Sequence, residues 1–256
     1  MKPNAHCSGT KKEQITEMFD SISGQYDLLN RLLSLGVDRW WRQSMVKRVG
    51  RRKPQSVLDV ATGTGDSAIA LKKSGATRIV GVDISEQMLK QAQKKPTSAG
   101  IEFVKADGER LPFDDGCFDA VTISFGIRNF EHRRQGLQEM RRVLKQNGLL
   151  LVLELSMPAN RIIRSLYKLY FLRIVPAVGK LVSRNSYAYR YLPCSVDEFP
   201  PRQVFAAEIQ NAGFERVKAI SLSGGLATIY EAKKSEKTQQ HIHSTHGSCG
   251  RVLRCR

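Results

Sequence analysis

Apolar residues in the middle of the chain alternate between short continuous runs and longer stretches with helical spacing. Strands are predicted at 56–60, 78–83, 101–106, 118–124 and 148–154, and helices near 66–74, 85–95 and 132–145. Ser85 is suited to cap the second of these helices, with Glu86 in its first turn. Because strands and helices of this length alternate regularly, the pattern predicts an α/β fold around a doubly wound, mostly parallel sheet.

Two further helices are predicted upstream of this α/β core, which covers residues 54–155. Thr10 and Glu13 match a capping box, and a second helical run begins near Asp38. We therefore expect residues 10–53 to be an N-terminal helical addition that forms a lid or one wall of a substrate site.

The pattern changes downstream of the core. Residues 161–184 are apolar and basic, and they predict two helices broken at Pro176, with another helix near 198–212. We expect residues 156–212 to face substrate or membrane. On the first of these helices Arg161, Arg164 and Lys168 share one face, while Ile162, Ile163, Leu166, Leu169 and Tyr170 occupy the rest. This arrangement suits either a helix at an anionic lipid surface or a core-facing helix with a solvated basic stripe.

The last ordered segment, residues 213–234, is expected to complete the sheet. Two strand-like runs, 214–222 and 226–233, are separated by a pair of glycines and bring the expected number of strands to seven. A single domain over residues 10–234 is predicted, with flexible segments at 1–9 and 235–256.

The chain is strongly basic, with a formal net charge of +17 over 256 residues. The last 22 residues hold four cations and one carboxylate, so that +14 remains on residues 1–234. A basic folded region indicates an anionic partner, either a nucleic acid or an anionic membrane surface, and a merely solvated basic surface is the simpler alternative.

Cysteine usage and hydropathy indicate the compartment. Five cysteines are scattered without a paired C-x-x-C motif, which is typical of a reducing environment. The N-terminus lacks the apolar core of a signal peptide, and no run of about 18 apolar residues occurs. We therefore expect a cytoplasmic protein whose membrane contact, if any, is peripheral. The histidines of the C-terminal segment match no standard zinc spacing, so no metal is expected.

The most informative segment is 57–66, an apolar strand that ends in a glycine-rich turn. Gly63 and Gly65 allow the backbone to approach a ligand, and Asp83 ends the next strand, where a carboxylate can accept hydrogen bonds from ribose hydroxyls. The third glycine of a dinucleotide-binding turn would fall near Ile69 or Ala70 and is absent. The turn therefore favours a cofactor with adenosine but no pyrophosphate, and S-adenosylmethionine fits best.

Polar residues follow each of the first four strands, at the edge where parallel sheets bind ligands. The candidate cofactor-binding residues are Asp59, Gly63, Thr64, Gly65, Asp83, Asp107, Gly108 and Ser124. Arg128 and Asn129 follow the fourth strand, where a methyl acceptor would meet the sulfonium, and they are the candidate catalytic residues. Each has a plainer alternative as a turn glycine, a helix cap or a surface arginine.

The chain resembles the ubiquinone/menaquinone-biosynthesis C-methyltransferases over roughly residues 12–233. The resemblance rests on Phe19-Asp20, Tyr26-Asp27, Asn30, Ser34, Gly36, either Arg39-Trp40 or Trp41-Arg42, Gly63-Thr64-Gly65-Asp66, Asp83-Ile84-Ser85, Leu111-Pro112-Phe113, Ser124-Phe125-Gly126-Ile127-Arg128-Asn129, Leu153-Glu154-Leu155-Ser156 and Tyr189-Arg190-Tyr191-Leu192. The runs that contain Arg128-Asn129 and Tyr189–Leu192 are the most specific. Departures include Thr62 and Cys194, where the family usually has glycine and glutamate.

The resemblance implies the fold of a class I methyltransferase and methyl transfer from S-adenosylmethionine to a ring carbon of a prenylated hydroquinone such as demethylmenaquinol. It also implies that Thr64, Asp83, Asp107, Gly108 and Ser124 contact the cofactor. In this hypothesis Arg128 stabilises a developing phenolate or polarises a water, Asn129 orients it, and His132 is a weaker candidate base.

Two other classes of function remain open from the sequence. A nucleic-acid methyltransferase would explain the charge, but no base-binding module and no catalytic Asn/Asp-Pro-Pro-aromatic motif is found. A non-enzymatic nucleoside sensor would explain the glycine turn but not Arg128 and Asn129. The oligomeric state is also open, a homodimer included.

Overall fold

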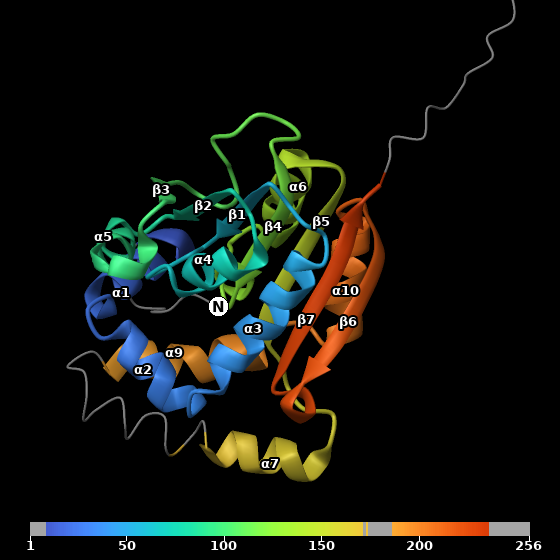
Figure 1. The fold of residues 1–256 in the computed structure, drawn as a ribbon. Coiled ribbons are helices and arrows are strands. Elements are labelled where there is room, and N and C mark those ends of the chain that lie inside the picture. The colour runs from blue at the N-terminus through green and yellow to red at the C-terminus, as the bar shows by residue number, and fades with distance from the viewer. Residues whose placement is uncertain (1–8, 171–172, 174–185, 236–256) are drawn as a thin grey trace, which may run out of the picture.

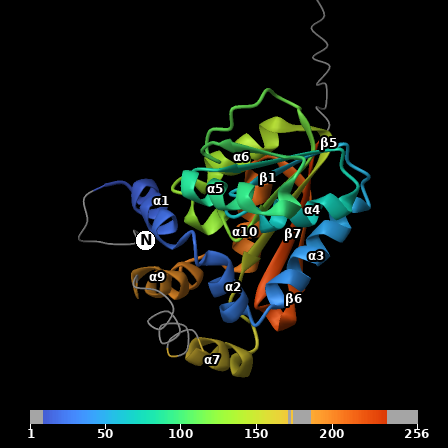
Figure 2. The same ribbon diagram turned by 60° about the vertical axis from the view of Figure 1, so that its left-hand side comes forward.

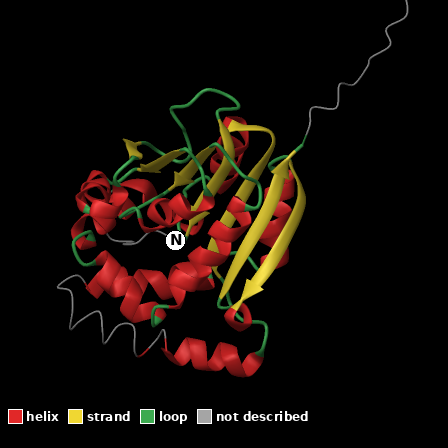
Figure 3. Ribbon diagram, viewed as in Figure 1, coloured by secondary structure: helices red, strands yellow, loops and turns green. Residues whose placement is uncertain are grey.

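The computed structural model describes residues 9–170, 173 and 186–235, and its centre is a seven-stranded sheet with helices on both faces (Figure 1, Figure 3). The strands are β1 Ser56–Val60, β2 Arg78–Asp83, β3 Ile101–Lys105, β4 Phe118–Ser124, β5 Leu144–Leu155, β6 Phe214–Leu222 and β7 Ala227–Lys234. Their order is β3-β2-β1-β4-β5-β7-β6, and only β7 pairs antiparallel, with both of its neighbours. The predicted doubly wound, mostly parallel sheet is confirmed.

The described helices are α1 Lys11–Ile22, α2 Tyr26–Ser34, α3 Val37–Gly50, α4 Asp66–Leu71, α5 Glu86–Lys94, α6 Arg133–Val143, α7 Arg161–Leu169, α9 Ser186–Asp197 and α10 Arg202–Asn211. The two predicted caps are confirmed. Thr10 and Glu13 form a reciprocal capping box at α1, and the Ser85 side chain accepts a hydrogen bond from Met88 N at α5.

Sequence analysis missed two helices and misplaced two boundaries. Neither α2 nor α9 was predicted; α9 contains Pro193 in its interior, a position that normally ends a helix. The helix expected from 198 starts only at Arg202, and β5 starts at Leu144 rather than at 148. The expectations for residues 1–8, for the segment around Pro176 and for residues 236–256 lie outside the described residues.

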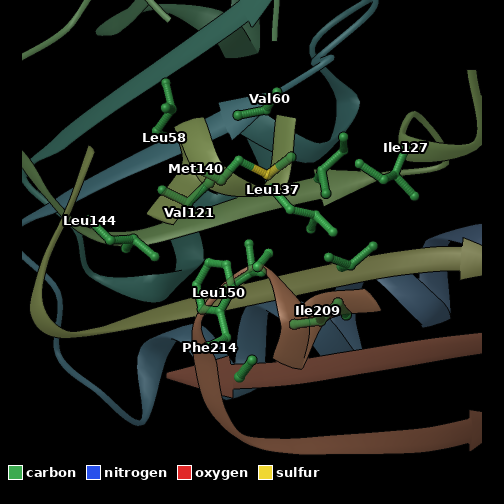
Figure 4. Packing of buried hydrophobic residues seen from close by; sticks show 14 of the residues in the cluster. Leu58, Val60, Val121, Ile127, Leu137, Met140, Leu144, Leu150, Ile209 and Phe214 are labelled. Atoms are coloured by element: carbon green, nitrogen blue, oxygen red, sulfur yellow. The ribbon is translucent and has the colours of Figure 1, made fainter. Parts of the chain in front are cut away.

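Two apolar layers hold the helices against the sheet. On one face, Leu58 and Val60 of β1 pack with residues of α6 and α10, such as Leu137 and Ile209 (Figure 4). On the other face, Val57, the residue before Leu58, packs with α3 and α4. Because successive strand residues point to opposite faces, one five-residue strand that is buried throughout serves both layers.

The N-terminal helices reach around the end of the sheet where the parallel strands finish. In Figures 1 and 2, α1, α2, α9 and α7 lie on that side of the molecule, and α7 forms its outer edge. No helix in the described part of the chain is long and apolar enough to cross a membrane.

Candidate active site

A pocket of about 740 Å³, here called the strand-end pocket, opens at the carboxyl ends of β1, β2 and β4 and at the loop after β3. Six of the ten predicted site residues line it: Gly63, Asp83, Asp107, Gly108, Ser124 and Asn129. The strand ends thus bring together residues that are up to 66 positions apart in the sequence, as the topology of a parallel sheet requires.

Asp83 is held at the floor of the strand-end pocket by two backbone amides. Gly63 N donates to Oδ2 at 2.8 Å and Ser85 N donates to Oδ1 at 2.8 Å. Burial, together with the nearby Asp20, raises the pKa of Asp83 to about 6, although these hydrogen bonds lower it. Each carboxylate oxygen keeps lone pairs for donors from a ligand, which suits a ribose diol.

The turn after β1 exposes its backbone to the pocket. Gly63 has a φ of +56°, and a Cβ added to it would meet no atom closer than 4.0 Å, at Tyr26, so it would occupy ligand space. Ala61 and Phe125, which line the pocket from two different loops, also have positive φ values of 51° and 59°. Left-handed non-glycine residues are costly and cluster at ligand sites, so this pair supports a binding role for the pocket.

Asp107 faces a lysine from α1. Lys12 Nζ lies 2.5 Å from Asp107 Oδ2 and 3.0 Å from Glu109 Oε2. Burial would lower the pKa of Lys12, but the hydrogen bonds to these two carboxylates outweigh it and raise the pKa. Asp107, a predicted cofactor contact, is therefore paired with a cation from α1 in this structure.

Three predicted cofactor residues lie beside the strand-end pocket rather than on its lining. Asp59 is fully buried, and its two oxygens accept hydrogen bonds from Thr62 and Thr122, both at 2.7 Å. Thr64 donates to Asp27 Oδ1 at 2.5 Å, and a Cβ at Gly65 would come within 3.0 Å of Ala92. These residues hold the turn after β1 in place, and two of them contact α2 and α5.

A second, larger and mainly apolar cavity of about 1220 Å³, here called the apolar cavity, lies between α2, α3, α7 and α9. Its apolar lining comes from Leu35, Val37, Trp41, Leu155, Ile163, Leu166, Leu192 and Leu226. Polar side chains reach it from Asn30, Ser34, Asp38, Arg42 and Arg128. Sequence analysis did not predict this cavity, because the four helices meet only in the folded chain.

The strand-end pocket and the apolar cavity share two lining residues, Tyr26 and Phe125. Burial raises the pKa of Tyr26, so its phenol stays protonated, and Asn30 and Arg128 oppose the shift. A ligand in one pocket and a ligand in the other would therefore lie next to the same two aromatic rings.

Arg128 lies in the apolar cavity next to this junction and is paired with a buried glutamate. Its Nη1 donates to Glu154 Oε1 at 2.7 Å and to the Phe125 carbonyl at 2.5 Å, and its Nε lies 3.3 Å from Ser195 Oγ. The arginine side chain is 7% exposed and the glutamate 0%. Burial alone would lower the pKa of Arg128, but Glu154 outweighs it and keeps the pKa above its usual value, so the guanidinium is a fixed charge.

Neighbouring residues fix the loop that carries Arg128. Asn129 lines the strand-end pocket, and its Oδ1 accepts a hydrogen bond from the Tyr191 hydroxyl at 3.2 Å. Lys11 Nζ donates to the Phe130 carbonyl at 2.8 Å. His132 is exposed and lines neither the strand-end pocket nor the apolar cavity, so it is not placed to act as a base.

Sequence analysis assigned no role to Glu154 or Tyr26, although both belong to the runs that carried the resemblance. The signal for Glu154 was available: a single carboxylate inside the continuous apolar strand 149–155 must find a partner when it is buried. Nothing in the sequence of Tyr26 distinguishes it from an ordinary core aromatic residue.

Helix α7 turns much of its apolar surface outward. Ile162, Leu166 and Leu169 are 73%, 62% and 49% exposed, while Tyr167 is buried. The structure therefore contradicts the alternative in which the apolar face of this helix packs fully on the core. Among the described residues, no group of histidines, cysteines and carboxylates is arranged to hold a metal ion.

The sheet order, the strand-end pocket and the absence of a third turn glycine define a class I S-adenosylmethionine-dependent methyltransferase fold. Solved structures with this fold include an S-adenosylmethionine-dependent methyltransferase of Thermotoga maritima, with a TM-score of 0.61 and 19% identity over 86% of this chain and 100% of that one. The cyclase SpnF is nearly as similar, with a TM-score of 0.60 and 15% identity over 87% of this chain and 96% of that one. At such identities the likeness shows the fold alone.

The sequence comparisons go further. Residues 7–234 match the model of the ubiE/COQ5 methyltransferase family. A ubiquinone/menaquinone biosynthesis C-methyltransferase of Geotalea uraniireducens is 47% identical over 88% of this chain and 97% of its own, and a demethylmenaquinone methyltransferase of Bacteroides fragilis is 41% identical over 91% and 97%. The chain belongs to the ubiE/COQ5 methyltransferase family, and it is an S-adenosylmethionine-dependent enzyme.

The strand-end pocket fits S-adenosylmethionine on its own geometry. The open space above Gly63 and the half-buried carboxylate of Asp83, held by two backbone hydrogen bonds, suit the adenosine part, and no phosphate-binding turn is needed. When bound there, the cofactor supplies an electrophilic methyl group.

Proposed function

We propose that this enzyme methylates a ring carbon of a polyprenylated hydroquinone, with demethylmenaquinol, which yields menaquinol, as the first substrate to test. The observation that carries the proposal is the junction at Tyr26 and Phe125, where a pocket suited to adenosine adjoins a larger, mainly apolar cavity. The relatives named for menaquinone and ubiquinone biosynthesis support the same acceptor class.

The lining of the apolar cavity suits a prenylated ring. Aliphatic and aromatic side chains would receive a ring and the first part of a prenyl tail, and a few polar groups near the junction would orient the ring oxygens. A charged nucleic acid would have to enter between Leu35, Ile163 and Leu166, where apolar contacts offer nothing to phosphates.

Arg128 is the proposed catalytic residue for stabilising charge on the acceptor. A hydroquinone carbon becomes nucleophilic when a neighbouring hydroxyl loses its proton, and a fixed guanidinium beside that oxygen stabilises the phenolate. Glu154 and the Phe125 carbonyl hold Arg128 in place, so little reorganisation is needed. Because it stays charged, Arg128 would not take the proton itself.

We assign the predicted cofactor residues to two groups. Asp83, Asp107, Gly108, Ser124 and the Gly63 backbone would contact S-adenosylmethionine, with Asn129 orienting the loop between cofactor and acceptor. Asp59, Thr64 and Gly65 would act through the shape of the turn.

We also infer that α1 and α2 form a lid over the strand-end pocket. Several polar contacts link the lid to the pocket, among them Lys12 with Asp107 and Glu109, Lys11 with the Phe130 carbonyl, Asp20 with Ser85, and Asp27 with Thr64. The adenine amine would compete with Lys12 for Asp107, so cofactor entry would require at least this contact to open.

The exposed side of α7 is the proposed contact with an anionic membrane. Ile162, Leu166 and Leu169 are exposed beside Arg161 and Arg164, and Leu166 also lines the apolar cavity. An apolar surface with flanking cations favours the interface of an anionic bilayer. A prenyl tail could then pass from lipid into the cavity, with the protein bound peripherally at the cytoplasmic face.

The test is a methyl-transfer assay with purified protein, labelled S-adenosylmethionine and detergent-solubilised demethylmenaquinol, compared with the benzoquinol analogue and with total RNA. The proposal expects label on the naphthoquinol and little on RNA. Label on RNA alone, or on neither quinol, would contradict it.

A further inference from the structure

A polar cluster in the apolar cavity has no part in the mechanism derived above. It consists of Ser34 at the end of α2 and of Asp38 and Arg42 on the first turns of α3. Asp38 is 4% exposed and Arg42 is 8% exposed, so the cluster is buried in a cavity whose lining is mainly apolar. Burying charged groups in such a cavity costs free energy, and a close partner offsets only part of that cost.

The carboxylate of Asp38 is held by one neighbour on each oxygen. Ser34 Oγ donates to Oδ1 at 2.6 Å, and Arg42 Nη1 makes a short ion pair with Oδ2. A carboxylate has about four lone-pair sites, so both oxygens can accept a further hydrogen bond from a ligand in the cavity.

The cluster lies at the same junction as Arg128. The Arg42 guanidinium lies 5.6 Å from the centroid of the Phe125 ring, and Arg128 donates to the carbonyl of that same residue. Both arginine–carboxylate pairs, Arg42–Asp38 and Arg128–Glu154, therefore contact Phe125, one of the two residues that both pockets share.

One atom of the cluster lacks a partner that a ligand could supply. Arg42 Nε is buried and has no hydrogen-bond acceptor among the described residues. Buried donors are rarely left unpaired, and an acceptor oxygen next to Asp38 would satisfy this one.

The other titratable groups of the cavity are unsuited to accept a proton. Among the described lining residues Asp38 is the single carboxylate, and the rest of the titratable set is Tyr26, Arg42, Arg128, Tyr167 and Tyr170. The tyrosines have raised pKa values because they are buried, and the arginines are charged. Glu154 does not line the cavity, and its oxygens are taken by Arg128 and by Leu155 N.

We propose that Asp38 is the general base of the reaction, taking the proton from an acceptor hydroxyl, with Ser34 and Arg42 as its positioning residues. This inference rests on the proposed function, because it requires a phenolic acceptor. Asp38 with Arg42 binds one ring oxygen, and Arg128 stabilises the negative charge that develops on the acceptor.

The step balances without an additional reactant. The O–H bond breaks and its proton goes to Asp38, and the electron pair left on oxygen is delocalised to the ring carbon that forms the new bond to the methyl carbon. The methyl–sulfur bond breaks with its electrons remaining on sulfur. The ring carbon then gives its proton to water while Asp38 returns its proton to the oxygen, so each turnover releases one proton.

The first test compares Asp38→Asn with wild type in the quinol methylation assay. We expect kcat to fall by about 10²–10⁴-fold, the usual contribution of a general base, while the affinity for S-adenosylmethionine changes less than twofold. The matched control is Asp114→Asn, an exposed aspartate that lines neither pocket, which should keep wild-type kcat. Wild-type kcat in folded Asp38→Asn would overturn the inference.

A second variant remains informative if Asp38→Asn folds poorly, and a binding measurement adds to the first test if it folds. In Ser34→Ala the charged carboxylate loses one hydrogen bond, so the acidic limb of the kcat–pH profile should move to higher pH, which a purely structural role would not produce. Trp41 lines the cavity, so in a Trp40→Phe background its fluorescence reports hydroquinone binding without turnover. Weaker hydroquinone binding to Asp38→Asn supports a direct contact with the ring oxygen.

The possible failures can be told apart. If wild type methylates no quinol, the proposed function fails and the role of Asp38 falls with it. If wild type is active but the acidic limb of Ser34→Ala is unmoved and Asp38→Asn is fully active, only the assignment of the base is wrong.

Discussion

The strand-end pocket and the apolar cavity adjoin one another but are built in different ways. Loops that directly follow strands form the floor and sides of the strand-end pocket, and several of its contacts come from backbone amides such as Gly63 N and Ser85 N. Helices from four separate segments form most of the apolar cavity, and its polar contacts come from long side chains such as Arg42 and Arg128. The first is fixed by the sheet, and the second depends on how the helices pack against it.

This difference in construction matches the different ligands that the two sites would bind. Fixed strand ends suit a cofactor that is the same in every turnover, whereas helices can change their spacing to suit different acceptors. The buried pairs Arg42–Asp38 and Arg128–Glu154 contribute little net stability by themselves, since desolvation offsets their attraction. Both arginines contact Phe125 at the junction of the two pockets, where the proposed reaction takes place.

The largest expected effect comes from the acceptor side. Arg128→Ala should lower turnover by roughly 10²–10³-fold, as loss of one charge-stabilising donor usually does, and should leave S-adenosylmethionine binding nearly unchanged. Methyl-transfer kinetics and calorimetric binding measure the two quantities separately. Because Glu154 would be left buried and unpaired, thermal unfolding must confirm that the variant is folded, and Arg128→Lys serves as the variant that keeps the charge. Wild-type turnover in Arg128→Ala would remove this residue from the mechanism.

The next effect comes from the cofactor side. Asp83→Asn should weaken S-adenosylmethionine binding by about 10–100-fold, because hydrogen bonds to a charged carboxylate contribute roughly 1.5–3 kcal/mol. The pKa of Asp83 is raised to about 6 by burial, so the ionised form that accepts ribose hydroxyls is lost as pH falls through about 6. Wild-type affinity should therefore decrease below that pH, and titrations at pH 5 and pH 8 test it. An affinity independent of pH would separate Asp83 from the ribose.

A smaller effect, on membrane binding, is expected at the exposed side of α7. Ile162→Glu should weaken binding to vesicles that contain anionic lipid by about tenfold, because one exposed isoleucine no longer enters the bilayer. The matched control is Val204→Glu, which places the same charge on a half-exposed valine of α10. Co-sedimentation measures both variants. Equal losses would indicate a general charge effect, and no loss in either would separate α7 from the membrane.

Only a small effect is expected at Asp59, where S-adenosylmethionine affinity in Asp59→Asn should stay within about threefold of wild type. Its pKa is also raised to about 6 by burial, against hydrogen bonds from Thr62 and Thr122. The folded state therefore binds more protons than the unfolded chain, and this residue lowers the free energy of unfolding as pH rises from about 4 to about 6. Denaturant unfolding of Asp59→Asn should show a smaller decrease over that range, by up to about 3 kcal/mol.

The comparison of Asp59→Asn with Asp83→Asn separates the effect of burial from the effect of ligand contact. Burial raises the pKa of both residues to about 6, but of the two only Asp83 lines the strand-end pocket. A large loss of cofactor affinity in Asp59→Asn would mean that the turn after β1 is less rigid than its hydrogen bonds indicate.

The sequence predicted the strand-end pocket better than the apolar cavity for a physical reason. Turn glycines, helix caps and carboxylates at strand ends act over a few residues, so Gly63, Asp83 and Ser85 could be interpreted from their neighbours. The contact of Arg42 with Phe125 joins residues 83 positions apart, and no local pattern encodes it. The same holds for α9, whose internal Pro193 argues against a helix until tertiary packing is known.

The most direct test of the account is a structure of the ternary complex with a hydroquinone acceptor and an S-adenosylmethionine analogue that carries an amine in place of the methyl group. The account predicts the ring beside Phe125, one ring oxygen on Asp38 and Arg42, and a ring carbon about 3–3.5 Å from the amine. A ring bound outside the apolar cavity, or one that reaches neither Arg128 nor Asp38, would contradict it.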